Sequence, residues 1–256
     1  MRRIQQITVV GIAGIPRVRP GNNIAKLIAE AATRQGTGVE EGDIMVVSQK
    51  IVSKSEGRVV NLRQVKPSPF ALSLATSLRK DPSLVELALR ESKSIIRMGH
   101  GNLITETRHG WICANAGVDR SNVSGGARAT LLPLDSDRSA RKLRRRIRLL
   151  TGKNVAVIIA DTFGRPHREG VVNMAIGLAG LEPILDLRGK KDLFGYTLVV
   201  KQIAVADELA AAAELAMGNA DEGLPAAIIR GFRRCEPSET ASAKPLIRRH
   251  AKDLFR

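Results

Sequence analysis

The sequence predicts an α+β (mixed α/β) fold, with mixed sheets and flanking helices, and three observations lead to this prediction. The chain has 256 residues, of which 43% are hydrophobic and 26% charged, so it is long enough to bury a sizeable core. Short apolar runs typical of strands alternate irregularly with segments of helical spacing. No low-complexity linker or internal repeat separates them. We therefore predict a single domain over residues 1–256.

The predicted strands are short apolar runs bounded by polar or turn residues. Residues 155–160 form an unbroken apolar run, which is typical of a strand buried on both faces. Residues 103–107 and 111–114 flank Arg108-His109-Gly110 and form a hairpin candidate. The full set of predicted strands covers residues 7–10, 43–48, 103–107, 111–114, 155–160, 196–205 and 226–229.

The predicted helices combine helical spacing of apolar residues with capping residues at their ends. Asn22 or Asn23 caps the first helix, and Gly218 ends an alanine-rich one. Asp137 or Ser139 caps a strongly basic helix. The full set of predicted helices covers residues 22 or 23 to 33, 72–78, 83–91, 138–150, 206–217 and 245–255.

The formal charge of +16 favours anionic partners such as nucleotides, polyanionic small molecules or nucleic acid. The densest basic run, residues 138–150, places Leu143, Ile147 and Leu150 at helical spacing, which is typical of an amphipathic helix with a solvated basic face. A nucleic-acid patch is the alternative. Aromatic residues are only 3% of the chain, which removes most base-stacking platforms, so nucleic acid is poorly supported.

The sequence carries no membrane or export signal that we can recognise. No run of about 18 apolar residues is present, and the N-terminus lacks a signal-peptide pattern, so we expect a cytoplasmic protein without a membrane span. Cys113 and Cys235 lie far apart, which argues against a disulfide framework, and Cys113 is expected to be a small buried hydrophobe. The histidines form no ligand pair, so a zinc site is not supported.

Two aspartates, Asp119 and Asp161, each stand just past a short apolar run. Open α/β sheets hold their ligands at the carboxyl ends of strands, where Asp161 is expected. Asn, Thr and Arg surround both aspartates, and these side chains suit a divalent metal together with phosphate. For Asp119 the alternative is an Asx-type turn without a ligand, and for Asp161 it is a structural ion pair with Arg165 or Arg168.

Lys50 and Lys54 are the best candidates for binding an anion. They share one face if the segment after the second strand is helical, although two solvated lysines are the alternative. The phosphate-binding patterns GxxxxGK[ST] and GxGxxG are both absent, so no P-loop or Rossmann motif is present. A bound nucleotide would therefore require a different architecture.

From about residue 7 to residue 231 the chain resembles the coenzyme F420:L-glutamate ligase family. The segments that carry the resemblance, in order, are GIPRVRPGN, VVSQKIVSKSEGR, NAGVDRSNV, LLPLDSDRSA, DTFGRPHREG, GKKDLFG and VADELAAAAELAMG. The resemblance implies GTP-dependent ligation of L-glutamate to coenzyme F420-0 through an acyl phosphate, with further γ-glutamyl additions and release of GDP and phosphate. It also implies Mg²⁺ or Mn²⁺ as cofactor, K⁺ as a further candidate, and an intertwined homodimer. No C-terminal nitroreductase-like extension is expected.

The resemblance assigns roles to individual residues. Asp119, Asp161 and Lys54 would be catalytic; the two aspartates would also bind one metal, and Thr162 would help to bind a second. Where the family pattern supplies a glutamate to the second metal, this sequence has Asn219, which offers an uncharged carbonyl oxygen. The residues implied to contact GTP are Ile15, Pro16, Arg17, Val18, Gln49, Lys50, Lys54, Asn122, Met217, Gly218, Asn219, Ala220, Asp221, Glu222, Gly223 and Leu224.

Some alternatives stay open at the level of sequence. Asp221 or Glu222 could take the place of the missing glutamate at the second metal. The same nucleotide site could serve an amide ligase that acts on another carboxylate acceptor. The third reading is a basic nucleic-acid-binding protein, which predicts duplex binding that falls steeply with salt and is indifferent to Asp119→Ala.

Overall fold

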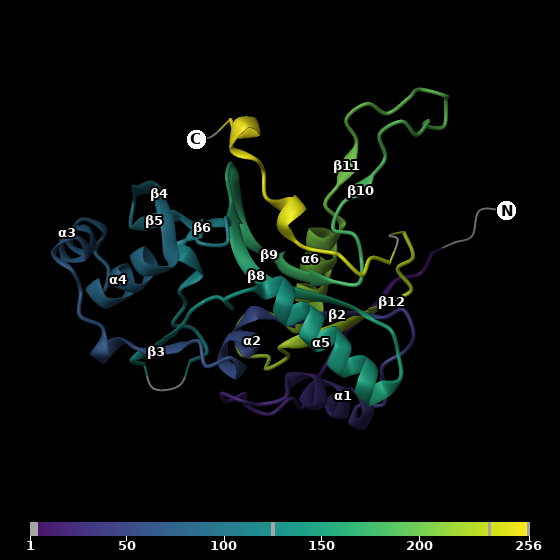
Figure 1. The fold of residues 1–256 in the computed structure, drawn as a ribbon, viewed down its shortest axis with the longest axis horizontal. Helices are drawn as coiled ribbons and strands as arrows, with labels where there is room; N and C mark the ends of the chain where they lie inside the picture. The colour runs from purple at the N-terminus through teal and green to yellow at the C-terminus, as the bar shows by residue number, and fades with distance from the viewer. Residues whose placement is uncertain (1–4, 124–125, 235–236, 255–256) are drawn as a thin grey trace.

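The computed structural model describes residues 5–123, 126–234 and 237–254 and is a mixed α+β structure (Figure 1). Its centre is a five-stranded sheet in the order β1-β12-β2-β8-β9. Strands β2 and β8 pair in parallel, whereas the other neighbours in this sheet are antiparallel. The strands are β1 (Thr8–Gly11), β12 (Ala226–Arg230), β2 (Ile44–Ser48), β8 (Ala156–Arg165) and β9 (Arg168–Ala179).

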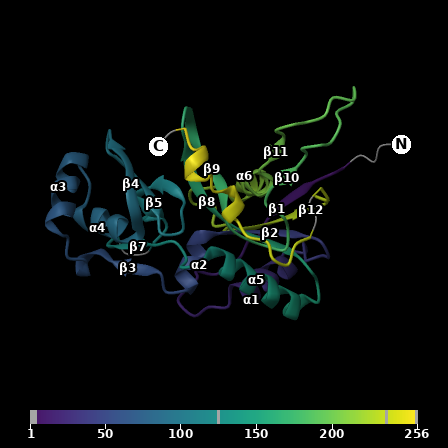
Figure 2. The same cartoon turned by 45° about the horizontal axis from the view of Figure 1, so that its top comes forward.

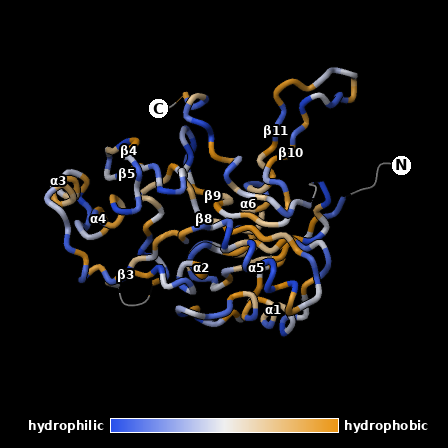
Figure 3. Tube along the Cα trace, viewed as in Figure 1, coloured by the Kyte–Doolittle hydropathy of each residue, from blue (hydrophilic) through white to orange (hydrophobic). Residues whose placement is uncertain are grey.

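The central strands are buried on both faces because each face is covered by helices. Met45 and Val47 of β2 pack in one core cluster with α1 (Ile24–Arg34) and α5 (Ser136–Thr151). The alternate residues of β2 pack in a second cluster with α6 (Val205–Met217). This alternation follows the period of two along a strand. Figure 3 shows the same central strands as the most hydrophobic part of the molecule.

A small lobe lies beside the central sheet, at the left of Figures 1 and 2. It contains a third core cluster, formed mainly by the helices that begin at Pro69 and Pro82, against which Leu103 packs. A two-stranded ladder, β3 (Val59–Asn61) with β7 (Arg128–Thr130), connects it to the rest of the molecule. The helices and strands of the lobe are α3 (Pro69–Leu78), α4 (Pro82–Glu91), β4 (Ser92–Gly99), β5 (Asn102–Thr107) and β6 (Ile112–Ala114).

Several predicted elements are confirmed with small shifts at their ends. The hairpin candidate forms, since β5 and β6 pair in antiparallel register. Asn23 caps α1 by accepting a hydrogen bond from the Lys26 amide, and Gly218 ends α6. The segment after β2 is helical, as α2 (Gln49–Ser55).

The predicted cap of the basic helix α5 is wrong. Asp135 caps it, because its carboxylate accepts the Arg138 amide at 2.8 Å. Asp137 instead accepts the backbone amides of Leu178 and Ala243, both at 2.9 Å, and so ties α5 to β9 and to the C-terminal segment. Ser139 is likewise buried inside the first turn of the helix, where it donates to the Glu56 carboxylate.

The interpretation of α5 as an amphipathic helix is confirmed. Leu143 and Ile147 are buried, but Leu150 in the last turn is 49% exposed. Arg144 is held between the Val155 carbonyl and the Glu239 carboxylate. The exposed cations of this helix are Arg138, Arg141, Lys142, Arg145 and Arg148.

The predicted strand at 196–205 is wrong. Only Gln202–Ile203, strand β11, is paired, with β10 (Leu185–Asp186). The residues between these strands form an arm that extends from the body in Figures 1 and 2. Within the arm, Lys191 and Thr197 form an isolated bridge, and the large apolar side chains that are exposed are Leu193, Phe194, Tyr196, Val199 and Val200.

The predicted terminal helix over 245–255 is also wrong. The described part of this segment contains two short 3-10 turns, Lys244–Leu246 and His250–Lys252. Pro245 lies in the first turn, and the preceding backbone is anchored to Asp137 rather than to a helix of its own. Residue 255 and Cys235 lie outside the described residues. None of the described helices is long and apolar enough to cross a membrane.

Candidate active site

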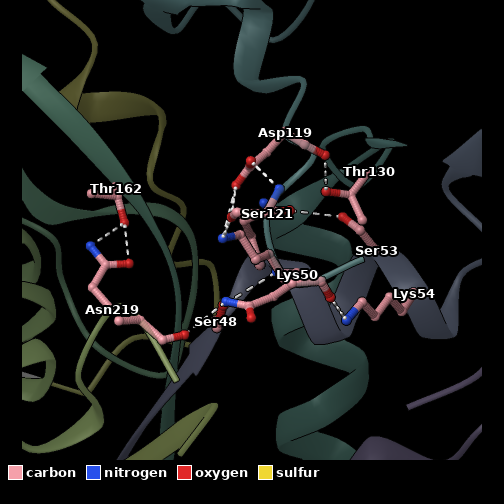
Figure 4. A network of polar contacts seen from close by, with 12 residues as sticks. Ser48, Lys50, Ser53, Lys54, Asp119, Ser121, Thr130, Thr162 and Asn219 are labelled. Atoms are coloured by element: carbon pink, nitrogen blue, oxygen red, sulfur yellow. Dashed lines mark hydrogen bonds and ion pairs between the residues drawn. The ribbon is translucent and has the colours of Figure 1, made fainter. Parts of the chain in front are cut away.

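A cavity of about 560 Å³ lies where the turn that follows β6 meets the start of α2 and the middle of β8. Four segments contribute to its walls: α2, the turn after β6, strand β8 and the loop after α6. Figure 4 shows the polar contacts around it. The lining residues are Lys50, Ala114, Asn115, Gly117, Val118, Asp119, Ser121, Asp161, Thr162, Asn219, Ala220 and Glu222.

Asp161 lies inside strand β8, not after its end as predicted. The parallel pairing of β8 with β2 stops at Ala160, opposite Ser48, whereas β8 continues to Arg165 by pairing with β9. Asp161 is therefore the first residue past the parallel ladder and faces the cavity. The pKa of its carboxyl group is raised to about 7, chiefly by burial and also by the charge of Asp119, against the lowering effect of the Thr162 amide and Lys50.

Asp119 also lines the cavity, and its carboxylate is held by neighbouring side chains and backbone. Its carboxylate accepts the Ser121 amide at 2.7 Å and the Ser121 hydroxyl at 2.8 Å, which is the Asx-type turn named as an alternative. Lys50 Nζ lies 2.8 Å from the same carboxylate. Burial alone would raise the pKa of Asp119, but the hydrogen bonds from Lys50 and Ser121 outweigh it, and the pKa is lowered.

The turn that presents Asp119 is strained. Asn115, Ala116 and Gly117 all have left-handed backbone angles, with φ of 52°, 54° and 71°. A side chain at Gly117 would meet Leu132 at 2.7 Å, so this approach requires glycine. Lys80, at the junction of α3 and α4, donates to the Asn115 side chain at 3.0 Å. Strain of this kind is concentrated at functional sites, because the surrounding structure must maintain it.

Lys50 and Lys54 lie one turn apart on α2, so the helix that their predicted shared face required does form. Lys54 Nζ donates to the Asn122 carbonyl at 2.7 Å. Burial, followed by the charges of Lys50 and Arg17, lowers the pKa of Lys54. Such a group is suited to the charge of an anionic ligand.

The loop after α6 forms the remaining wall. Asn219 donates to Thr162 Oγ1 at 3.3 Å (Figure 4). It also donates to the Glu214 carboxylate at 2.9 Å. The Ala220 amide donates to Glu222 at 2.8 Å. Backbone amides, first its own and then that of Ala220, lower the pKa of Glu222, so this exposed carboxylate at the cavity is ionised.

The structure brings some of the predicted site residues to the cavity and places others around it. Asp119, Asp161, Thr162, Lys50, Asn219, Ala220 and Glu222 line it. Asn122 joins two of its walls by donating to the Ala220 carbonyl at 3.1 Å.

Other predicted contacts lie farther from the cavity wall. Ile15 and Val18 are partly buried against the core, and Met217 is within it. Pro16, Gly218, Asp221, Gly223 and Leu224 are not among the lining residues. Gln49 is 1% exposed. Lys80 gave no sequence signal, because the residue that it contacts is 35 positions away.

The oxygen donors at the cavity fit a hard divalent cation. Asp119 and Asp161 supply carboxylates, and Thr162 and Ser121 supply hydroxyl oxygens, all of which Mg²⁺ and Mn²⁺ accept. Burial is the largest cause of the raised pKa of Asp161, and the charge of Lys50 offsets it only in part. No group of three or more His, Cys, Asp or Glu side chains forms a cluster among the described residues. A set of two carboxylates suits Mg²⁺, which commonly retains waters and binds substrate phosphates.

Alternatives at the two aspartates can now be compared. The ion pairs among the described residues include none between Asp161 and either Arg165 or Arg168, so the structural ion pair suggested for Asp161 does not form there. The Asx-type turn at Asp119 does form, but it leaves the carboxylate at the cavity wall. The turn and a ligand site are therefore compatible.

Comparison with known proteins gives consistent matches. Residues 13–231 match the family model described as F420-0:Gamma-glutamyl ligase. The chain is 51% identical over 250 residues to the coenzyme F420:L-glutamate ligase of Methanothermobacter thermautotrophicus, covering 98% of this chain and 99% of that protein. It is 50% identical over 242 residues to the protein of the same name from Methanopyrus kandleri, covering 94% of each chain. The protein of that name from Methanocaldococcus jannaschii is 42% identical over 254 residues and 98% of each chain.

Proposed function

The chain belongs to the F420-0:gamma-glutamyl ligase family and is a ligase, and from this premise we propose that it joins L-glutamate to coenzyme F420-0 in a reaction that depends on GTP and Mg²⁺ or Mn²⁺. Further γ-glutamyl additions would follow at the same site. The observation that carries the proposal is one cavity lined by both Asp119 and Asp161, with Lys50 of α2 in the same lining. A phosphate-rich substrate and a divalent cation are the ligands that this combination suits.

The proposed chemistry has two steps. An oxygen of the acceptor carboxylate attacks the γ-phosphorus of GTP, the bond to the β-phosphate oxygen breaks, and GDP leaves behind an acyl phosphate. The nitrogen of the glutamate amine then attacks the acyl carbon, the bond to phosphate breaks, and the amide forms with loss of the amine proton. Activation is needed because a free carboxylate is a poor electrophile.

The residues have distinct tasks in this proposal. Asp119 and Asp161 would hold a divalent cation, which when bound neutralises phosphate charge and orients the attack. Thr162 and Asn219 lie together on the neighbouring wall and would serve a second cation, with Glu222 as the nearest additional carboxylate. K⁺ is a further candidate there.

The cations of α2 would bind the nucleotide phosphates. Lys50 would exchange part of its contact with Asp119 for phosphate oxygens, and Lys54 would lie against the same anion. The Asn122 contact with Ala220 would help to hold the loop after α6 over the nucleotide.

We also propose that the protein is a homodimer in which the arm between β10 and β11 contacts a second copy. Leu193, Phe194 and Val200 on this arm are 75%, 96% and 85% exposed. Apolar groups concentrated on one exposed segment are typical of an interaction surface. Phe194→Asp combined with Val200→Asp is expected to give a monomer, measured as a halved mass by light scattering; an unchanged mass would contradict this surface.

The experiment that tests the activity is GDP release from GTP in the presence of Mg²⁺ or Mn²⁺, L-glutamate and coenzyme F420-0, with the product followed by mass. Glutamate-dependent turnover and a mass gain of one glutamyl unit are expected. GTP binding without turnover would instead indicate another carboxylate acceptor. The absence of both GTP binding and turnover would contradict the proposed reaction.

A further inference from the structure

Gln49 lies beside Asp161 because of the parallel register of two strands. The ladder between β2 and β8 ends with Ser48 opposite Ala160. The next residues along the two chains are Gln49, which begins α2, and Asp161. Parallel strands leave their ladder on the same edge of the sheet, so these side chains emerge as neighbours.

The Gln49 side chain is buried, and a hydrogen bond from Ser53 fixes its orientation. It is 1% exposed, and its Oε1 accepts a hydrogen bond of 2.9 Å from the hydroxyl of Ser53, which is itself fully buried one turn later in α2. In this arrangement the Oε1 end of the amide faces Ser53. The NH₂ group must therefore point away from Ser53.

The NH₂ group of Gln49 has no hydrogen-bond partner in the described structure. Nε2 is buried, and no acceptor meets hydrogen-bond geometry with it. Buried donors are almost always paired, so an orphaned one indicates an interaction that this state of the protein lacks. The acidic residue that emerges beside Gln49 at the end of the β2–β8 ladder is Asp161, which lines the cavity.

We propose that Gln49 is a positioning residue that donates to the Asp161 carboxylate when Asp161 binds a divalent cation, and that it does not itself contact the nucleotide. The inference rests on the proposed metal dependence. It differs from the role implied by resemblance, in which Gln49 contacts GTP. A side chain that is 1% exposed and does not line the cavity is better placed to act through Asp161. Hydrogen-bonded partners of metal ligands orient those ligands and increase their affinity.

The test separates metal binding from nucleotide binding. Mn²⁺ is titrated into nucleotide-free wild-type protein and followed by electron paramagnetic resonance, and a fluorescent GTP analogue is titrated separately in EDTA. Gln49→Met keeps the length of the side chain but removes the donor. Gln64→Met is the matched control, since Gln64 is an exposed glutamine remote from the cavity lining. Circular dichroism confirms that each variant is folded.

We expect Gln49→Met to weaken Mn²⁺ binding by roughly tenfold or more, with nucleotide affinity in EDTA unchanged. Ser53→Ala should weaken Mn²⁺ binding by a smaller factor because it frees the amide to rotate, and this variant serves if Gln49→Met does not fold. Mn²⁺ affinity equal to that of the wild-type protein in these variants would overturn the inference. A loss of nucleotide affinity alone would also overturn it and would indicate that Gln49 contacts the nucleotide directly. Absence of Mn²⁺ binding by the wild-type protein would instead overturn the proposed metal dependence, and this inference with it.

Discussion

The turn that carries Asp119 and the strand that carries Asp161 look alike in sequence and differ in structure. Each places an aspartate after a short apolar run and among small polar residues. Asp161 is enclosed by β2 and β9 and has no ion pair among the described residues, and the pKa of its carboxyl group rises to about 7. The Asp119 side chain is 37% exposed and paired with Lys50, and its pKa is lowered.

The difference shows that the environment, not the residue type, tunes the two carboxylates in opposite directions. Burial disfavours the charged form of Asp161, whereas Lys50 and Ser121 favour the charged form of Asp119. The carboxyl group of Asp119 is thus kept ionised by its own neighbours in the protein. The carboxyl group of Asp161 becomes ionised near neutral pH or when a cation binds.

The largest expected effect is on turnover and would show whether the two aspartates act as a unit. Asp119→Asn and Asp161→Asn should each reduce GDP release by roughly 10³-fold, because each removes one of two charged ligands of the proposed cation. Glu30→Gln, on the exposed side of α1, is the control and should retain wild-type turnover. Activity within tenfold of wild type in either aspartate variant would contradict a shared metal site.

The second prediction separates the aspartates by the sign of their effect on stability. The folded-state pKa of Asp161, about 7, exceeds its ordinary value of 3.8, so the folded state binds the proton more tightly and ionisation of this group costs stability as pH rises toward 7. In EDTA at pH 8, Asp161→Asn should therefore raise the free energy of unfolding, by at most about 4 kcal/mol. The gain should shrink at pH 5.

Asp119→Asn should act in the opposite direction. Its folded-state pKa is lowered, so it stabilises the fold above its ordinary pKa and loses this effect as the pH falls through the folded value. At pH 8 the variant should lower the free energy of unfolding by roughly 1 kcal/mol or less, since the Lys50 pair is partly exposed. Urea denaturation measures the free energy of unfolding of both variants. A change of the same sign in both would contradict the opposite tuning of the two aspartates.

The third prediction compares a glycine from each segment. Gly117→Ala should lower the free energy of unfolding by roughly 1–3 kcal/mol, because its φ of +71° is unfavourable for alanine and a Cβ would lie 2.7 Å from Leu132. Gly164→Ala, in β8, is the matched control: nothing lies within 4 Å of its Cβ position. Thermal denaturation should show a clear loss for the first variant and little change for the second.

The smallest expected effect concerns Cys113, which lies between the two segments. Burial, and then the charge of Asp161, raises the pKa of its thiol to about 12, so labelling by thiol reagents at pH 8 should be very slow in the folded protein. In a Cys235→Ser background, Asp161→Asn should speed labelling by less than about tenfold. Asp119→Asn should leave the labelling rate of Cys113 unchanged. Equal acceleration by both aspartate variants would show that the rate responds to a general loss of stability and not to the charge of Asp161.

Much of the fold could be predicted locally. The Asn23 cap, the apolar strand starting near residue 155 and the alanine-rich helix ended by Gly218 depend on neighbours within a few residues. Strand β9 was not predicted, because its exposed first half and buried second half show neither alternation nor a uniform apolar run. Strand β4 was missed for a similar reason, since it is largely exposed and its apolar residues do not alternate regularly with polar ones.

The site shows the same division. The two aspartates, the lysines of α2 and the loop after α6 could be named from their residue types and from resemblance to a family. Their mutual placement could not, because Lys50 and Asp119 are brought together by the folding of the intervening small lobe. The support that Lys80 gives to Asn115 has the same origin.

The sequence by itself determined which segments form most of the helices and strands and which residues can carry the chemistry, since propensity, capping and side-chain type are properties of short segments. Tertiary structure alone decided that β2 and β8 pair in parallel register, so that Gln49 and Asp161 emerge side by side. It also decided that Asp161 is buried while Asp119 is paired. Burial and charge depend on which distant segments pack together, and for this reason two similar aspartates acquire opposite pKa shifts.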